Sequence, residues 1–480
     1  MLVGDEKTAK LAAGVRELLR VSPVISKLGQ LFQENGFELA LVGGPVRDAL
    51  LGRLGNDLDF TTDATPEQIT KTISGYVDAT WDIGARFGTI SASKDDLKLE
   101  ITTYRAEAYE ASSRKPEVVY GKSLADDLGR RDFSINAMAV KLPELEFVDL
   151  YEGLTDLENK TIRTPNTAES SFNDDPLRML RAARFASQLN FAVAPEIVVA
   201  MKDMKERINI VSKERVRDEI DKLILTDKPR LGLTLLIETG LMDLIMPEVP
   251  AMQLEADEHL KHKNIYEHSL VVLEQAIELE KTHEPQIAPD LILRLAALLH
   301  DIGKPKTRKF EDGNRVTFHH HEVVGAKMVK KRLKELRYSN DVIGQVSLLV
   351  ELHLRFHGFS GGEWTDSAIR RYVTDAGEEL LRLHKLTRAD CTTRNKKKAD
   401  ALQASYDQLE KRIAEVAEHE ELKAIRPDLD GTEIMELLNL KPGRLVGEAY
   451  KHMLEIRMEQ GPLDKEDAIK ELMKWWQNKS

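Results

Sequence analysis

Residues 37–59 combine a short strand, two glycines, a helix start and two closely spaced carboxylates, and this combination limits the folds that the chain can adopt. Phe37 to Val42 predicts a strand and Val46 to Leu54 a helix, with Gly43 and Gly44 between them. A helix that begins directly after glycines presents free backbone N–H groups, which suit a phosphate. The pattern therefore predicts an α/β unit with a phosphate site at the start of this helix.

A second extended segment, Asp57 to Thr61, carries Asp57 and Asp59. Side chains two residues apart on a strand point to the same face, so both carboxylates can reach one site. Two neighbouring acids repel each other unless cations lie between them, and Mg²⁺ ions that also bind a triphosphate fit this arrangement. Gly-Gly alone is often a turn and Asp-x-Asp alone a solvated loop; at this spacing they predict a bound nucleoside triphosphate, two metal ions and nucleotidyl transfer.

Composition and charge narrow the class of protein. The chain has 480 residues, of which 42% are hydrophobic and 31% charged, as in ordinary globular proteins of several domains. The single cysteine, Cys391, excludes an intrachain disulfide and suits a reducing cytoplasm. No apolar run approaches ~18 residues and no secretory signal pattern opens the chain, so we expect no membrane span and no secretion. The net charge of −12 argues against indiscriminate nucleic-acid binding.

Patterning along the chain predicts five segments. Strand signals, including period-two alternation at 97–104, are confined to the first third, and a 3.6-residue apolar period begins near residue 174. We expect a helical lead-in at 1–36, an α/β head at 37–165, a helical neck at 166–250, a histidine-rich helical block at 258–400 and a helical tail at 401–480.

Glu100 is a candidate third carboxylate. The alternation at 97–103 places it on the face opposite the apolar residues of that strand. Two interpretations are equally open: it lies beside Asp57 and Asp59, or it is an ordinary surface glutamate.

The segment Arg130-Arg131-Asp132 predicts further nucleotide contacts. Paired arginines suit phosphates, and an aspartate can accept a hydrogen bond from a ribose hydroxyl. Asn136 follows Asp132 by one helical turn, so both side chains could face the same ligand. Taken alone, such a run usually lies on the protein surface. Because it follows the motif at 43–59, we interpret it as part of a functional site.

Asp175 and Arg178 are candidates for reading the base. Asp174 or Asp175 can cap a helix that begins near Pro176, which is the simpler interpretation. Three residues apart on that helix, Asp175 and Arg178 would be neighbours on one face. Cytosine and adenine both present an exocyclic amine beside a ring-nitrogen acceptor, which suit an aspartate and an arginine respectively. Uracil and guanine reverse these groups, so the pair would select C and A without a template.

Taken in order, these motifs resemble those of bacterial class II tRNA nucleotidyltransferases, the CCA-adding enzymes of the polymerase-β-like superfamily. The match runs from residue 37 to about 225 and includes Gly43-Gly44-x-x-Arg47-Asp48, Asp57-x-Asp59, Arg130-Arg131-Asp132, Asp149…Gly153-x-x-Asp156-Leu157, Asp174-Asp175-x-x-Arg178 and Lys213-Glu214-Arg215-x-x-x-Glu219. The family's usual glutamate before the base-reading aspartate is Asp174 here, a conservative departure. The fold implied is α+β: a small polymerase-β-like α/β head followed by an elongated all-helical body that includes an HD domain.

The resemblance also implies roles for single residues. Asp57, Asp59 and Glu100 would be catalytic, and the first two would hold two Mg²⁺ ions. The residues implied in nucleotide binding are Gly43, Gly44, Arg47, Arg131, Asp132, Asn136, Asp175, Arg178 and Arg181. Residues 149–157 would be a hinge that reshapes the head between C and A.

The implied reaction is addition of C, C and A to the 3′ end of tRNA from CTP and ATP. The tRNA 3′-hydroxyl would attack the α-phosphate in line, and pyrophosphate would leave. The protein is expected to act in the cytoplasm as a monomer or a homodimer, with no membrane partner.

Bacterial poly(A) polymerases share most of these motifs and are the nearest alternative. Two features resemble the CCA-adding type more closely. These are Gly84 to Thr89 and the segment Tyr104 to Gly121, which resembles the flexible loop needed for the final A and absent from relatives that add only CC.

The histidine-rich block suggests a second site. His300-Asp301 ends an apolar helix, and imidazole with carboxylate suits a transition metal. The set resembles an HD-superfamily phosphohydrolase, which implies the ligands His268, His300, Asp301, His321, His353 and Asp390. His319 and His320 compete with the adjacent His321 for one of these places.

Two interpretations of this block remain open. Its histidines are either metal ligands that hydrolyse 2′,3′-cyclic phosphates or 2′-nucleotides at RNA ends, or ordinary residues of a domain retained for packing. A metal-dependent phosphohydrolase whose head only binds nucleotide is therefore the third functional alternative.

Overall fold

The computed structural model describes residues 3–82, 84, 88–108, 117–120, 123–253, 264–287, 289–311, 315–356, 364–392, 396–422 and 425–479. The chain divides into two compact units, Met1–Pro247 and Glu248–Ser480. The two features that favour the CCA-adding type lie partly outside the described residues, namely at 85–87 and at 109–116 and 121. Among the described residues, none of the helices combines the length and the hydropathy that crossing a membrane requires.

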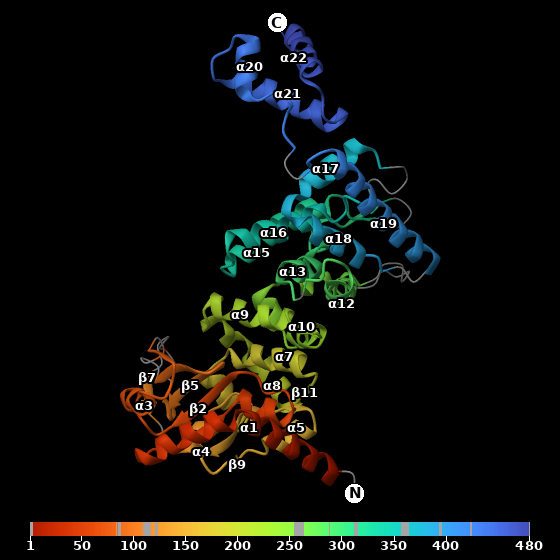
Figure 1. The fold of residues 1–480 in the computed structure, drawn as a ribbon. Helices are drawn as coiled ribbons and strands as arrows, with labels where there is room; N and C mark the ends of the chain where they lie inside the picture. The colour runs from red at the N-terminus through yellow and green to blue at the C-terminus, as the bar shows by residue number, and fades with distance from the viewer. Residues whose placement is uncertain are drawn as a thin grey trace. The chain divides into compact units, whose positions relative to one another are not determined.

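A seven-stranded mixed sheet forms the centre of the first unit, in the order β3-β4-β5-β2-β1-β8-β9 (Figure 1). The pair β2–β5 is parallel and every other neighbouring pair is antiparallel. The strands are β1 Leu39–Val42, β2 Asp57–Thr62, β3 Ala79–Trp81, β4 Thr89–Lys94, β5 Leu97–Thr103, β8 Met138–Leu142 and β9 Glu146–Asp149. Two further pairs lie outside this sheet: β6 Arg105–Ala108 with β7 Glu117–Tyr120, and β10 Thr161–Ile162 with β11 Ala192–Val193.

Helices complete the first unit. They are α1 Val3–Glu34, α2 Gly44–Leu50, α3 Pro66–Ile73, α4 Leu124–Gly129, α5 Gly153–Glu158, α6 Ala168–Asp174, α7 Arg178–Leu189, α8 Pro195–Met204, α9 Lys213–Ile224, α10 Pro229–Glu238 and α11 Leu241–Ile245, with the 3₁₀ turns η2 Ser134–Asn136 and η3 Lys205–Ile210. The long helix α1 packs on α2, α3 and β8. It does so through a stripe of fully buried apolar residues that includes Ile25, Leu28 and Phe32, so the polar lead-in is part of the head's core.

The connection from β1 to α2 begins the helix two residues earlier than predicted. Gly43 has φ 74°, which glycine adopts without a steric penalty, and Pro45 occupies the first turn, where its missing N–H is not needed. All four residues of β1 are buried. The turn between Val42 and Pro45 therefore follows the end of a buried strand that has a neighbouring strand on each side.

The second unit is largely helical. Its helices are α12 Ile265–Thr282, α13 Leu291–Leu299, α14 Lys304–Thr307, α15 His321–Glu335, α16 Asn340–Leu352, α17 Asp366–Ala376, α18 Leu380–Ala389, α19 Lys396–His419, α20 Gly431–Leu438, α21 Arg444–Gln460 and α22 Lys465–Lys479, with the 3₁₀ turns η4 Pro250–Met252 and η6 Gly377–Glu379. A small hairpin, β12 Lys309–Glu311 with β13 Arg315–Thr317, is its one departure from the predicted all-helical body among the described residues. The predicted fold class is otherwise confirmed.

Candidate active site

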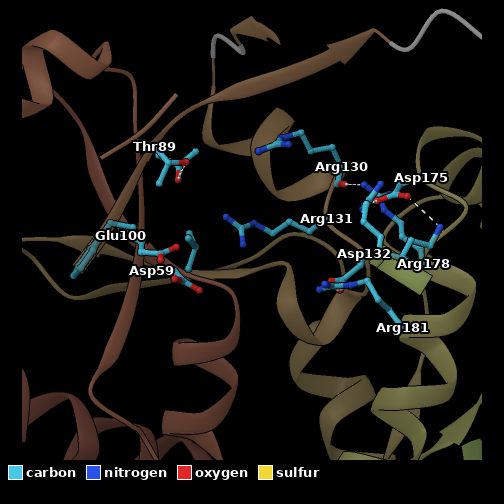
Figure 2. Close-up of a pocket in the computed structure, with 14 residues that line it drawn as sticks. Asp59, Thr89, Glu100, Arg130, Arg131, Asp132, Asp175, Arg178 and Arg181 are labelled. Atoms are coloured by element: carbon cyan, nitrogen blue, oxygen red, sulfur yellow. Dashed lines mark hydrogen bonds and ion pairs between the residues drawn. The ribbon is translucent and has the colours of Figure 1, made fainter. Parts of the chain in front are cut away.

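A polar pocket of about 420 Å³ opens in the first unit, over the middle of the sheet (Figure 2). Its charged lining consists of Asp59, Glu100, Arg130, Arg131, Asp132, Asp175, Arg178, Arg181 and Arg215. Figure 2 shows Asp59 and Glu100 on one side, the base-reading candidates on the other, and the Arg131 side chain pointing across the space between them. The pocket therefore has an acidic wall and a wall rich in arginine.

The acidic wall is built by two parallel strands. Asp59 on β2 lies in register with Glu100 on β5, and the buried and exposed residues of β5 alternate as predicted. Burial and the nearby carboxylates of Glu100 and Asp57 raise the pKa of Asp59 to about 6. Asp57 lies outside the pocket lining, with an exposed carboxylate 3.6 Å from Lys98 Nζ. Of the two interpretations of Glu100, this position favours a third carboxylate.

Gly43 makes room for Arg131 at the acidic wall. A Cβ atom at Gly43 would lie 2.9 Å from Arg131 Nη1 and 3.8 Å from Asp59 Oδ2. A side chain here would push the Arg131 guanidinium away from this position, and φ 74° would add strain. The glycine that the motif supplies therefore lets an arginine approach the carboxylates.

Four predicted nucleotide-binding residues stand behind the pocket and are not part of its lining: Gly43, Gly44, Arg47 and Asn136. Arg47 is buried and donates through Nη1 to Asn136 Oδ1 at 2.7 Å, and Asn136 Nδ2 donates in turn to Asp132 Oδ1 at 3.0 Å. The predicted proximity of Asn136 and Asp132 is therefore found, although only Asn136 lies on the short turn η2. In this arrangement Arg47 and Asn136 support Asp132.

Asp132 is held from both sides. Its Oδ2 accepts a hydrogen bond from Arg181 Nε at 2.8 Å and a second, very short one from Arg181 Nη2. Burial opposes ionisation, but the Arg181 guanidinium and Asn136 outweigh it and lower the pKa of Asp132 to about 2. Arg181 in turn faces the buried Glu219 on α9, at 3.9 Å. Asp132 is therefore a fixed anion at the arginine-rich wall.

Asp127, on α4, is not among the predicted residues, yet it orients two of them. It is fully buried and accepts hydrogen bonds from Arg130 Nη2 at 2.7 Å and from Arg131 Nη2 at 2.9 Å. Although burial opposes it, the two guanidinium groups hold the pKa of Asp127 below its usual range. Asp127 precedes the paired arginines by three and four residues, a spacing that brings side chains together at the end of a helix, and this was the signal available in the sequence.

Asp175 and Arg178 line the same pocket, but they do not share a helix face as predicted. α6 ends at Asp174, and α7 begins at Arg178. Asp175 lies in the connection, where Oδ1 accepts the Leu177 N–H at 3.0 Å, so its side chain supports the turn before α7. The buried Arg178 donates to Ser171 Oγ at 2.9 Å and to the Arg130 carbonyl at 2.6 Å. The turn, and not helical spacing, brings the pair together.

The predicted hinge segment has a well-defined local structure. Asp149, at the end of β9, accepts hydrogen bonds from the backbone N–H groups of Gly153 and Leu154 at 2.8 and 2.9 Å, which caps α5. A Cβ at Gly153 would lie 2.3 Å from the Ser134 carbonyl oxygen, so α5 packs closely on η2. Its role as a hinge stays a prediction.

The second unit brings all six predicted HD residues together. They form two sets whose ligand atoms lie within 4.8 Å of one another, His268 with His300 and Asp390, and Asp301 with His321 and His353. His300 Nε2 lies 3.3 Å from His268 Nε2 and 3.3 Å from Asp301 Oδ2. His321 Nε2 lies 3.2 Å from Asp301 Oδ1, so Asp301 connects the two sets.

The backbone orients the imidazoles toward a common centre. The Nδ1 atoms of His300, His321 and His353 bond to the carbonyl oxygens of Ala297, Phe318 and Val350 at 2.9, 2.8 and 2.7 Å. Such outward contacts are typical of metal-binding histidines, because they leave Nε2 free for the metal. The buried Nε2 atoms of His321 and His353 meet no hydrogen-bond donor and instead face Asp301 Oδ1, at 3.2 and 3.8 Å. A metal ion fits these orphaned acceptors.

The charge states of these histidines differ, and their exposure separates the buried set from its neighbours. Burial lowers the pKa of His353 to about 3, which keeps its imidazole neutral and able to bind a metal. Burial also acts on His300, but the neighbouring carboxylates Asp301 and Asp390 raise its pKa to about 9. His319 and His320 are exposed, with side chains 72% and 84% accessible, so the competition with His321 is resolved in favour of His321.

Three regions of the chain match models of known protein families. Residues 39–163 match the Poly A polymerase head domain, residues 190–252 the probable RNA and SrmB-binding site of polymerase A, and residues 265–405 the HD domain. The chain therefore combines a region that matches a poly A polymerase head, a region that matches an RNA-binding segment and a region that matches an HD domain.

The relatives narrow the relationship further. The chain is 39% identical over 264 residues to the CCA-adding enzyme of Lactococcus lactis subsp. cremoris, covering 53% of this chain and 63% of that protein. It is 40% identical over 213 residues to that of Levilactobacillus brevis, covering 44% of this chain and 52% of that protein. The aligned part thus spans less than two thirds of these relatives.

The fold is shared over nearly the whole chain. It matches the Bacillus stearothermophilus CCA-adding enzyme in complex with CTP with a TM-score of 0.65 at 23% identity, over 96% of this chain and 98% of that one. It matches the Thermotoga maritima CCA-adding enzyme complexed with tRNA with a TM-score of 0.58 at 18% identity, over 95% of both chains. The resemblance to CCA-adding enzymes that the motifs carry is thus confirmed in sequence relationship and in fold.

Proposed function

We propose that this protein adds C, C and A to the 3′ end of tRNA, using CTP and ATP and releasing pyrophosphate. The observation that supports this best is the single pocket in which Asp59 and Glu100 face Arg131, with Asp175 and Arg178 on the far wall. An acidic wall suits metal-bound phosphates, and the far wall suits the base. Because tRNA, CTP and ATP are its proposed substrates, we propose that the protein acts in the cytoplasm.

The carboxylates fit a pair of Mg²⁺ ions. Asp59 accepts no hydrogen bond and forms no ion pair among the described residues, and burial together with the Glu100 and Asp57 carboxylates raises its pKa, an effect that Arg131 and Arg47 offset only in part. Asp57 reaches the same face of β2 from the rim. Divalent ions bound by these acids would supply Lewis-acid activation of the attacking hydroxyl and stabilise the leaving pyrophosphate.

The chain's own groups then orient the substrate. Arg130 and Arg131, fixed by Asp127, are placed to bind phosphate oxygens. Asp132 already accepts two hydrogen bonds from Arg181, one from Asn136 and one from the Phe133 N–H, so a ribose hydroxyl would bind it by replacing one of these donors. Asp175 would accept from the amine of C or A, and Arg178 would donate to the ring nitrogen. Because these groups are fixed before the nucleotide binds, little reorganisation is needed when charge develops.

One assay separates the three functional alternatives. The full chain is incubated with Mg²⁺, a tRNA that lacks its CCA end and all four nucleoside triphosphates, and the RNA product is sequenced. Growth by C, C and A followed by a stop supports the proposal. A long A tail supports a poly(A) polymerase, and phosphate release without growth supports a phosphohydrolase whose head only binds nucleotide.

We infer a second activity for the HD domain, namely metal-dependent hydrolysis of 2′,3′-cyclic phosphates or 2′-nucleotides at RNA ends. The two residue sets joined by Asp301, with two buried imidazole nitrogens that face its carboxylate and no donor, support a transition-metal site there. Hydrolysis of 2′,3′-cyclic AMP by the protein loaded with Mn²⁺, Co²⁺ or Ni²⁺ tests it, and no turnover with any of them would reject it.

A further inference from the structure

Helix α9 contacts the pocket through one arginine. Arg215, in the first turn of α9, donates through Nη2 to Asp175 Oδ2 at 2.7 Å and belongs to the pocket lining. Arg215 belongs to the motif Lys213-Glu214-Arg215-x-x-x-Glu219 at the start of α9. The structure connects this helix to the residue proposed to read the base.

The Asp175 carboxylate is held at both oxygens. Oδ1 accepts the Leu177 N–H at 3.0 Å, and Oδ2 accepts from Arg215. Each carboxylate oxygen has two lone pairs, so each can accept one more hydrogen bond. With both contacts in place the plane of the carboxylate is fixed and its remaining lone pairs have set directions. Without Arg215, only the short contact to the Leu177 N–H restrains it.

Arg178, the partner in base reading, is anchored independently of α9. Its guanidinium donates to Ser171 Oγ and to the Arg130 carbonyl, and the side chain is buried. Removal of Arg215 would therefore release Asp175 and leave Arg178 in place. This asymmetry allows the effect of Arg215 on base preference to be predicted separately from an effect on the pocket as a whole.

We propose that Arg215 is a positioning residue for base selection, which holds the Asp175 carboxylate in the orientation that accepts from the amine of C or A. This inference rests on the proposed function. A fixed carboxylate rejects the carbonyl of uracil or guanine because two acceptors face each other in a site where neither finds a donor. A carboxylate that can turn toward solvent loses that penalty, so the wrong bases gain most.

The same face of α9 also supports the ribose side of the site. Glu219 follows Arg215 by four residues and is buried; it accepts from Arg184 Nε at 2.7 Å and faces Arg181, which binds Asp132. One turn of α9 thus supports the candidates for both base and ribose contact. Glu219 is a buried charge paired with two partly buried arginines, so a variant there would disturb folding, whereas Arg215 is half exposed and can be replaced safely.

The test compares Arg215→Ala with Arg215→Lys and Arg217→Ala. Arg217 lies one half-turn away on α9 and pairs with its neighbour Asp218 at 2.7 Å, which makes it a matched control. For each variant, kcat and KM are measured for CTP, ATP, UTP and GTP with tRNA substrates that end before each added position. Circular dichroism and thermal unfolding confirm that each variant is folded.

We expect Arg215→Ala to lower the ratio of kcat/KM for CTP to that for UTP about tenfold or more, while Arg217→Ala keeps the wild-type ratio. Arg215→Lys should recover part of the ratio, since an ammonium group can replace one hydrogen bond. In the Asp175→Ala background, Arg215→Ala should change the ratio no further, because Arg215 acts through Asp175. An unchanged ratio in folded Arg215→Ala, or an equal loss with all four nucleotides, would overturn the inference.

A binding measurement keeps the inference separate from the proposed function. If the wild type added no nucleotide to tRNA, the proposed function would fail on its own account. The dissociation constants of fluorescent CTP and UTP analogues would then decide about Arg215. A CTP preference that is present in the wild type and in Arg217→Ala but lost in Arg215→Ala supports the inference, and a preference that Arg215→Ala retains, or that the wild type lacks, overturns it.

Discussion

Asp59 and Glu100 lie side by side in register on the parallel strands β2 and β5, although one helix and two strands separate them in sequence. This single parallel pair in an otherwise antiparallel sheet places two carboxylates on the same wall of the pocket. The third, Asp57, stands at the rim on β2. The metal chemistry proposed for the head depends on this placement.

Loss of either aspartate of β2 should abolish nucleotide addition. We expect Asp57→Ala and Asp59→Ala each to reduce the rate of CMP incorporation at least about a thousandfold, because a lost metal ligand removes several kcal/mol of transition-state stabilisation. Single-turnover assays with labelled tRNA measure this rate. Lys98→Ala, which removes the present partner of Asp57, should stay within a few-fold of the wild type. Persistent activity in Asp57→Ala would refute its assignment as a metal ligand.

Asp175→Ala should alter base preference more than overall activity. The variant removes the acceptor for the exocyclic amine but leaves the metal site and the phosphate-binding arginines intact. We expect it to retain part of the activity with CTP and ATP and to admit UTP and GTP. Competition of all four nucleotides on one tRNA substrate, followed by sequencing of the products, measures this change. A base preference equal to that of the wild type would reject Asp175 and Arg178 as the base-reading pair.

Removal of Arg181 should destabilise the head. Asp132 is buried and accepts two hydrogen bonds from this side chain, so Arg181→Ala leaves an uncompensated charge. We expect a loss of about 3 kcal/mol in the free energy of unfolding of the first cooperative transition, measured by urea denaturation. Arg217→Ala, which removes a pair with the exposed Asp218, should change it by less than about 1 kcal/mol. Equal effects of the two variants would contradict the importance of the Asp132–Arg181 pair.

The pairing of Asp132 with Arg181 predicts that the stability of the fold depends on pH. The pKa of Asp132 is lowered from its usual 3.8 to about 2 in the folded protein. A carboxylate whose pKa is lower in the folded than in the unfolded state stabilises the fold at pH values above its unfolded-state pKa. This stabilisation is lost as the pH falls through the folded-state pKa. The stability difference between the wild type and Asp132→Asn should therefore shrink by about 2 kcal/mol between pH 5 and pH 2. A difference independent of pH would mean that Asp132 is not held as an anion.

Metal removal should act on the HD domain without stopping nucleotide addition. His300→Ala together with Asp301→Ala removes the residue that connects the two sets of ligands. We expect this variant to lose bound transition metal, measured by mass spectrometry of metals, and any phosphohydrolase activity, while CCA addition stays largely intact. Chelation of the wild type should lower its unfolding temperature, because a metal bound only to the folded state stabilises it. A large loss of addition in a folded variant would show that the two sites are not independent.

Much of the head could be predicted from short-range patterns. The strand, the glycine turn, Asp57, Asp59 and the alternation around Glu100 each follow from local geometry that a few residues determine. The neighbourhood of Asp132 and Asn136 was also predictable, although the connecting turn is 3₁₀ and not α-helical. In the HD domain, one apolar helix ending in His300-Asp301 was enough to indicate the site.

What could not be predicted depends on long-range packing. Arg47 and Asn136 support Asp132 from behind the pocket, and only the three-dimensional arrangement shows which arginines face the ligand. The choice of His321 over His319 and His320 is decided by burial beside Asp301. The Arg215–Asp175 contact joins α9 to the connection between α6 and α7, and no sequence spacing encodes their relative placement.

The position of bound metal tests the central claim most directly. Crystals of the wild type soaked with Mn²⁺ and a non-hydrolysable CTP analogue give anomalous difference density at the metal sites. The proposed mechanism predicts two peaks bound by Asp57 and Asp59, in contact with the triphosphate, and loss of both peaks in Asp59→Ala. A triphosphate bound elsewhere, or Asp57 and Asp59 pointing apart with no metal between them and the phosphates, would contradict it.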